Sequence, residues 1–86
     1  MLIHSPKDLA QYCRDQRKQQ GLSQVSIAEE IALRQDTVSK FEIKPDNVRL
    51  DTLFRLLAGL DMELHIVPKG QSTSVDDSRK GWTEQW

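Results

Sequence analysis

Apolar residues in the first part of the chain recur at the three- and four-residue spacing of an amphipathic helix. The spacing predicts a helix that begins at Pro6, behind an N-cap at Ser5, and runs to about Gln20, where Gly21 supplies a left-handed cap. The residues expected to face inward are Leu9, Tyr12 and Cys13. A basic group on the same helix is expected to face water or phosphate, and it comprises Arg14, Arg17 and Lys18.

Residues 22–42 have the pattern of two short helices joined by a tight turn. Ser23 is a favourable N-cap for the first of them, and Leu22 has the right spacing from Ile27 to form a hydrophobic staple. The first helix places its apolar residues on one face, and these are Ile27, Ala28 and Ile31. The pattern breaks at Ala32 and Leu33, which predicts the turn.

The pattern resumes from Gln35 to Phe41, where only Val38 and Phe41 are expected to be buried. A thin apolar seam beside a dense polar face is typical of a recognition helix in a DNA major groove. The side chains whose chemistry suits base edges are Arg34, Gln35, Asp36, Thr37 and Lys40. Those expected to hold phosphates are Ser23, Gln24, Ser39 and Lys44. The alternative is a plain helical hairpin that binds nothing.

A second helical stretch follows the turn at residues 45–47. Its apolar residues follow the i, i+3, i+4, i+7 rule and are expected to close the core. They are Leu50, Leu53, Phe54, Leu57 and Leu60, with Leu56 broadening the stripe. Residues 59–61 are expected to end this helix.

Residues 62–67 change to a period of two, which predicts a β-strand that Pro68 stops. One face of this strand carries Met62, Leu64 and Ile66. A lone strand in a helical chain leaves its backbone groups unpaired. The simplest solution is a second copy of the chain, paired antiparallel about a two-fold axis. Pairing with Leu2 and Ile3 is the alternative.

Residues 69–86 are polar, rich in Gly and Ser and without periodicity, so we expect a disordered tail. The sequence thus predicts one folded domain over residues 1–68 and a tail over residues 69–86. The tail holds both tryptophans, Trp82 and Trp86. Tryptophan is a favoured anchor in interface pockets, so the two residues are candidates for capture by a partner or by a protease. The alternative is a tail that lies back on its own domain.

Composition limits the possible functions. Hydrophobic residues are 37% of 86 residues, which supports only a small core, so oligomerisation is an expected source of stability. No apolar run could span a membrane, no signal-peptide pattern is present, and the single Cys13 fits a reducing cytoplasm. We find no catalytic triad pattern, no phosphate-binding glycine loop and no zinc spacing, and His65 alone is a poor metal ligand. We therefore expect neither enzymatic activity nor a cofactor.

The net charge of −1 argues mildly against a nucleic-acid binder. The distribution of charge matters more, because Arg34, Lys40 and Lys44 lie on or beside the proposed recognition helix. With few excess cations, specificity must come from base contacts and dimer geometry.

The helix-turn-helix resembles that of the Cro/C1-type (XRE) repressor family. The matching residues are Ser23, Gln24, Ala28, Ile31, Ala32, Leu33, Val38, Phe41 and Glu42. Ala32 departs from the family pattern, which usually has glycine at this turn. Such a fold is mostly α, with four to five helices and here one C-terminal strand that pairs across a homodimer.

The loop at residues 44–47, the strand and the tail ending in Trp86 narrow the resemblance to HipB-type antitoxins. This resemblance implies a cytoplasmic bacterial homodimer that represses its own operon at palindromic operators. It also implies a complex with a HipA-like serine/threonine kinase toxin. Two other classes stay open, a stand-alone XRE regulator without a toxin and a protein-interaction module that does not bind DNA.

Overall fold

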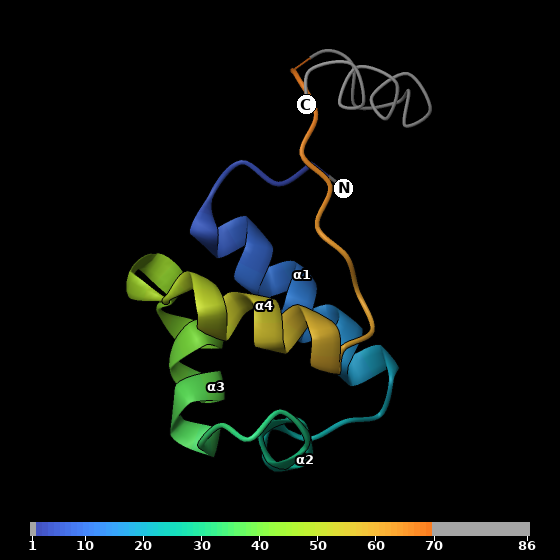
Figure 1. The fold of residues 1–86 in the computed structure, drawn as a ribbon, viewed down its shortest axis with the longest axis vertical. Helices are drawn as coiled ribbons and strands as arrows, with labels where there is room; N and C mark the ends of the chain where they lie inside the picture. Colours follow the sequence, from blue (N-terminus) through green and yellow to red (C-terminus); the bar gives the residue numbers. More distant parts are fainter. Residues whose placement is uncertain (1, 70–86) are drawn as a thin grey trace.

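The computed structural model describes residues 2–69, and within them the chain forms four α-helices and a short 3-10 helix. The elements are α1 (Pro6–Gln19), α2 (Gln24–Glu30), α3 (Gln35–Ile43), η1 (Pro45–Asn47) and α4 (Leu50–Gly59). Figure 1 shows α2 and α3 at one end of the molecule and the segment after α4 running towards the other. The predicted mostly helical fold is confirmed.

The helices begin where the sequence places their caps. Ser5 accepts a hydrogen bond from the Asp8 amide, with Pro6 at the first helical position of α1. Ser23 accepts from the Ser26 amide, and the Ser26 hydroxyl in turn accepts from the Ser23 amide, which completes a capping box. Both predicted N-caps are therefore confirmed.

Three helices end in the same way, with a residue at positive φ whose backbone satisfies the last carbonyl groups. Gly21 (φ 72°), Ala32 (φ 58°) and Asp61 (φ 59°) follow α1, α2 and α4. After α2, the Ala32 amide donates to Glu29 O and the Leu33 amide to Ala28 O, the paired bonds of a Schellman motif. The predicted turn at residues 32–33 is confirmed, although alanine occupies the position that favours glycine.

We predict that Ala32→Gly raises the free energy of unfolding by about 1 kcal/mol, since the left-handed conformation costs a residue with a Cβ roughly 1–2 kcal/mol. Ala58→Gly is the matched control, because Ala58 is exposed within α4 and glycine there removes about 1 kcal/mol. Urea unfolding at a fixed protein concentration measures both changes. A lower midpoint for Ala32→Gly would contradict the strain at this turn.

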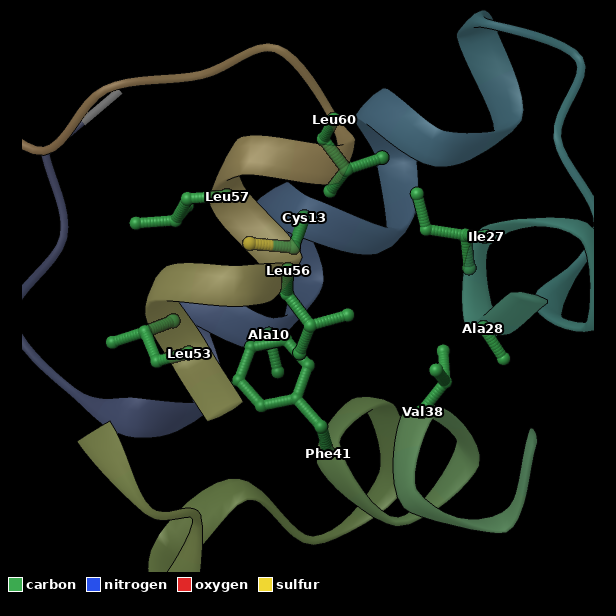
Figure 2. Close-up of a cluster of buried hydrophobic side chains, with 10 residues drawn as sticks. All are labelled: Ala10, Cys13, Ile27, Ala28, Val38, Phe41, Leu53, Leu56, Leu57 and Leu60. Atoms are coloured by element: carbon green, nitrogen blue, oxygen red, sulfur yellow. The ribbon is translucent and has the colours of Figure 1, made fainter. Parts of the chain in front are cut away.

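One hydrophobic core joins all four helices (Figure 2). Its buried members are Ala10, Cys13, Ile27, Ala28, Val38, Phe41, Leu53, Leu56, Leu57 and Leu60. Gly59 brings α4 close to α2, because a Cβ on Gly59 would lie 2.8 Å from Ile27 Cδ1 and would also meet Ile31. This close approach fixes the helix-turn-helix against α4.

The predicted apolar face of α4 was partly wrong. Leu50 is 70% exposed and Phe54 is 53% exposed, whereas Leu56, expected only to broaden the stripe, is 2% exposed. The core lies against the side of α4 that carries Leu53, Leu56 and Leu57, so the side with Leu50 and Phe54 faces solvent.

The single chain has no strand within residues 2–69, so the predicted strand at residues 62–67 is absent from it. A strand is defined by hydrogen bonds to a neighbouring strand. Leu2 and Ile3 do not provide them, which removes the intramolecular alternative. Pairing across a homodimer needs a second copy and stays a prediction, as does the division at residue 68. No helix within residues 2–69 is long and apolar enough to cross a membrane.

Candidate nucleic-acid interface

The helix α3 is anchored by two buried side chains and presents polar residues outward. Val38 and Phe41 are 1% and 2% exposed and pack into the core. The predicted base-reading residues Arg34, Gln35, Asp36 and Lys40 are all exposed, while Thr37 is half-buried. Four of the five predicted side chains are thus accessible to solvent, at the N-cap of α3 and along the helix.

Two of these side chains already contact each other. Lys40 Nζ lies 3.3 Å from Asp36 Oδ2, one helical turn apart, and both side chains are more than 70% exposed. An exposed pair of this kind adds little stability. It does hold a cation and an acceptor side by side on the surface of α3.

The predicted phosphate-contacting residues differ in their exposure and in the hydrogen bonds that they already make. Lys44 is exposed at the end of α3. The Ser23 hydroxyl caps α2, and Ser39 is half-buried. Gln24 is half-buried and hydrogen-bonded at both ends of its amide. Lys44 and Ser23 are therefore the exposed members of the set, and of these two the Ser23 hydroxyl is already engaged in the cap.

A hydrogen-bonded chain of side chains connects α1 to the start of α3. Gln35 Nε2 donates to Gln24 Oε1 (3.3 Å), and Gln24 Nε2 donates to Glu42 Oε1 (3.0 Å). Glu42 also accepts two bonds from Arg17, from Nε (2.7 Å) and from NH2 (3.1 Å). The proposed base-reading residue Gln35 is thus tied to a buried ion pair.

Arg17 corrects the expectation that it faces water or phosphate. The residue is 9% exposed, and besides Glu42 it donates through NH1 to the Leu22 carbonyl at 2.7 Å. In the sequence, the only sign of this burial is the spacing. Arg17 follows Cys13 by four residues and Ala10 by seven, which places all three on one face of the helix. Among residues 2–69, no buried polar side-chain atom lacks a partner.

Glu42 also acts on Cys13. Burial raises the pKa of the Cys13 thiol from 9.0 to about 11, and the negative charge of Glu42 adds to the effect. The thiol is therefore protonated at neutral pH, as a core residue should be.

This pKa predicts a pH dependence of stability. Below pH 9 the thiol is protonated in both states, but between pH 9 and pH 11 only the unfolded chain releases the proton. The free energy of unfolding should fall there by at most about 1.4 kcal/mol per pH unit. Cys13→Ala removes the titrating group, and urea unfolding from pH 8 to pH 11 compares the two chains. Equal slopes would contradict the prediction.

Apolar side chains are exposed on a different part of the surface. Leu50 and Phe54 lie one turn apart on α4, and the exposed fractions of Leu64 and Ile66 are 44% and 64%. Met62, the first residue of the predicted dimer strand, is half-buried and packs on the core. An open hollow lies beside this segment, lined by Tyr12, Ala58, Asp61, Met62, Glu63 and His65.

Other candidates give no further site. His65 Nε2 lies 3.0 Å from Glu63 Oε2, and residues 2–69 hold no cluster of three or more potential metal ligands. Trp82 and Trp86 lie outside the described residues.

Together, the capped α2, the turn at Ala32 and the exposed polar face of α3 define a helix-turn-helix protein. A helix-turn-helix family model matches residues 14–67. Antitoxin HipB of Escherichia coli K12 is 39% identical over 62 residues, which cover 72% of this chain and 70% of that protein. The chain therefore belongs to the helix-turn-helix family and, within it, to the HipB antitoxins.

Solved structures agree with this assignment. The HipB chain of a HipB-O4 20mer complex superposes with a TM-score of 0.78 at 35% identity, covering 80% of this chain and 97% of that one. The same TM-score, identity and coverage are found for a structure of a HipA-HipB-O2-O3 complex.

Proposed function

We propose that this chain is an antitoxin and transcriptional autorepressor that binds palindromic operator DNA as a homodimer. The observation that carries the proposal is the exposed polar surface of α3, which is anchored in the core by Val38 and Phe41. The similarity to HipB chains in solved complexes, one of which is a HipA-HipB-O2-O3 complex, supports it. The chain itself acts as a binder rather than as an enzyme.

In this proposal α3 lies in the major groove, and different residues contact the bases and the phosphates. Gln35 bonds bidentately to adenine, and Arg34 or Lys40 donates to guanine O6 and N7. Asp36 accepts from cytosine N4, and the Thr37 methyl contacts thymine. Phosphate contacts come from Ser23, Gln24, Ser39 and Lys44, which position the helix without reading sequence.

Two substitutions of exposed residues test which residues contact bases and which contact phosphates. Gln35→Ala should change the preferred sequence, whereas Lys44→Ala should weaken every sequence alike and lower the salt slope by about 0.9. Binding of each variant to a selected duplex and to a random duplex, over a range of salt concentrations, separates these effects. Equal losses on both duplexes for both variants would refute the assigned roles.

The homodimer proposal rests on the exposed apolar residues Leu50, Phe54, Leu64 and Ile66. A second copy would bury them and would pair residues 62–67 as a strand about the two-fold axis. Two α3 helices would then read two half-sites, which matches a palindromic operator.

The toxin part of the proposal is a complex with a HipA-like serine/threonine kinase. The test is a pull-down from native lysate with the full chain and with a chain lacking residues 69–86. Recovery of a kinase-like protein with the chain's own promoter supports the antitoxin role. Loss of the kinase on truncation would assign its capture to the tail at residues 69–86, and retention would assign it to the folded dimer. Promoter DNA without a kinase would leave a stand-alone XRE regulator.

A further inference from the structure

The predicted strand at residues 62–67 has a polar face and an apolar face. Glu63 Oε2 lies 3.0 Å from His65 Nε2, and the two side chains are 85% and 57% exposed. Residues two apart share a face when the backbone is extended, as it is in the segment that follows α4 in Figure 1. The contact therefore places Glu63 and His65 on one face. The other face carries the predicted dimer residues Met62, Leu64 and Ile66.

A two-fold axis allows few registers for this segment. In an antiparallel pair the axis stands perpendicular to the two-stranded sheet. Opposite side chains then share a face, and the axis passes between one residue and its own copy. An axis at Leu64 pairs residues 62–66 of the two copies, and an axis at His65 pairs residues 63–67. Any other position pairs fewer residues, because the left-handed backbone after α4 and Pro68 bound the segment.

The axis at Leu64 matches every pair of side chains in character. On the apolar face Leu64 lies opposite its own copy, and Met62 lies opposite Ile66 of the second copy. On the polar face Glu63 lies opposite His65 of the second copy, and the symmetry repeats this pair on the other side of the axis. Cross-strand pairs of opposite charge and of apolar side chains both stabilise a sheet.

The axis at His65 matches the side chains poorly. His65 would lie opposite its own copy and Glu63 opposite Val67, so each carboxylate would lack a cation across the strands. Like charges directly opposite each other destabilise a strand pair. Charge complementarity thus selects the axis at Leu64.

We propose that two copies of this chain pair with Leu64 on the two-fold axis, and that Glu63 of each copy binds His65 of the other. The contact seen within one chain is then replaced by two contacts between chains. The inference rests on the proposed homodimer and specifies its register. Moving the axis by one residue slides one copy past the other by two residues, about 6.8 Å. The register therefore sets how far apart the two α3 helices lie.

Cysteine cross-linking reads the register directly. Leu64→Cys, Glu63→Cys and His65→Cys are made one at a time in the full chain and oxidised, and the covalent dimer is followed on non-reducing gels. Only in Leu64→Cys does the thiol lie opposite its own copy, within the roughly 7 Å between Cα atoms that a disulfide spans. We expect this chain to cross-link at least about tenfold faster than the other two. The unmodified chain is the control, since its Cys13 is 2% exposed.

Charge reversal tests the pair between chains. His65→Glu places carboxylates opposite each other and should raise the dissociation constant of the homodimer at least about fivefold. Adding Glu63→Lys restores opposite charges and should return the constant to within about twofold of that of the unmodified chain. Gln11→Glu is the matched control, because it adds the same carboxylate at an exposed position outside residues 62–67. Sedimentation equilibrium measures each constant.

Fastest cross-linking of Glu63→Cys or His65→Cys would overturn the register and leave the homodimer standing. A dimer in which none of the three cysteines cross-links, or one whose dissociation constant His65→Glu leaves unchanged, would overturn the inference in the same way. An unmodified chain that sediments as a monomer at micromolar concentration would remove the proposed homodimer first, and the inference with it.

Discussion

Replacing Arg17 with methionine is expected to lower the free energy of unfolding by about 3–5 kcal/mol, because it leaves the buried Glu42 carboxylate without its cation. The loss is large for a domain of this size, whose total stability is on the order of 5 kcal/mol. The melting temperature should fall by more than about 10 °C. Urea unfolding and a thermal melt followed by circular dichroism measure the two quantities.

Two further chains show whether the unpaired charge causes the loss. The double substitution Arg17→Met with Glu42→Leu removes both charges and should recover much of the stability, since an apolar pair can replace a buried ion pair. Lys40→Ala breaks the exposed pair with Asp36 and should change the free energy of unfolding by less than about 1 kcal/mol. A double variant less stable than Arg17→Met would contradict the explanation.

The second large effect concerns Phe54. Phe54→Glu should raise the dissociation constant of the proposed homodimer at least about 30-fold, because a buried interface aromatic is worth about 2 kcal/mol or more. The fold should survive, since Phe54 is 53% exposed in the single chain. Sedimentation velocity from nanomolar to micromolar concentration measures the shift.

The control for this prediction introduces the same residue elsewhere. Lys7 is exposed at the start of α1 and is not one of the four apolar residues assigned to the dimer, so Lys7→Glu adds a carboxylate without replacing any of them. It should sediment as the unmodified chain does. An unmodified chain that sediments as a monomer at micromolar concentration would refute the homodimer, and a Phe54→Glu chain that remains fully dimeric would place the interface elsewhere.

Local signals made most of the fold predictable. Ser5 with Pro6, Ser23 and Gly21 each mark a helix end through bonds to residues a few positions away, so the sequence contains the whole feature. The turn at Ala32 followed from the break in apolar spacing, even though its residue departs from the usual glycine.

Features that depend on distant residues could not be predicted in the same way. Arg17 and Glu42 are 25 positions apart, and nothing local tells that they meet. The apolar stripe on α4 is wider than the core can cover, so the sequence does not say that Leu50 and Phe54 are left outside. The predicted strand at residues 62–67 needs a partner for its backbone, and no other segment among residues 2–69 pairs with it.

The candidate interface was predictable in part. The polar character of α3 was evident from spacing, and Arg34, Gln35, Asp36 and Lys40 lie at the surface as a recognition helix requires. The bonds of Gln24 to two other side chains were not evident, because Gln24, Gln35 and Glu42 come from different turns of α2 and α3. Only packing of the two helices brings them together.

The most direct test of the account is the binding of the full chain to the DNA upstream of its own coding sequence. A fluorescence titration at physiological salt would compare this duplex with a shuffled duplex of the same composition. We predict binding to the natural duplex at least about 10³-fold tighter, as for a specific operator. Equal affinity for the two duplexes would contradict the proposed sequence reading by α3, and with it the proposed role of this chain as an autorepressor.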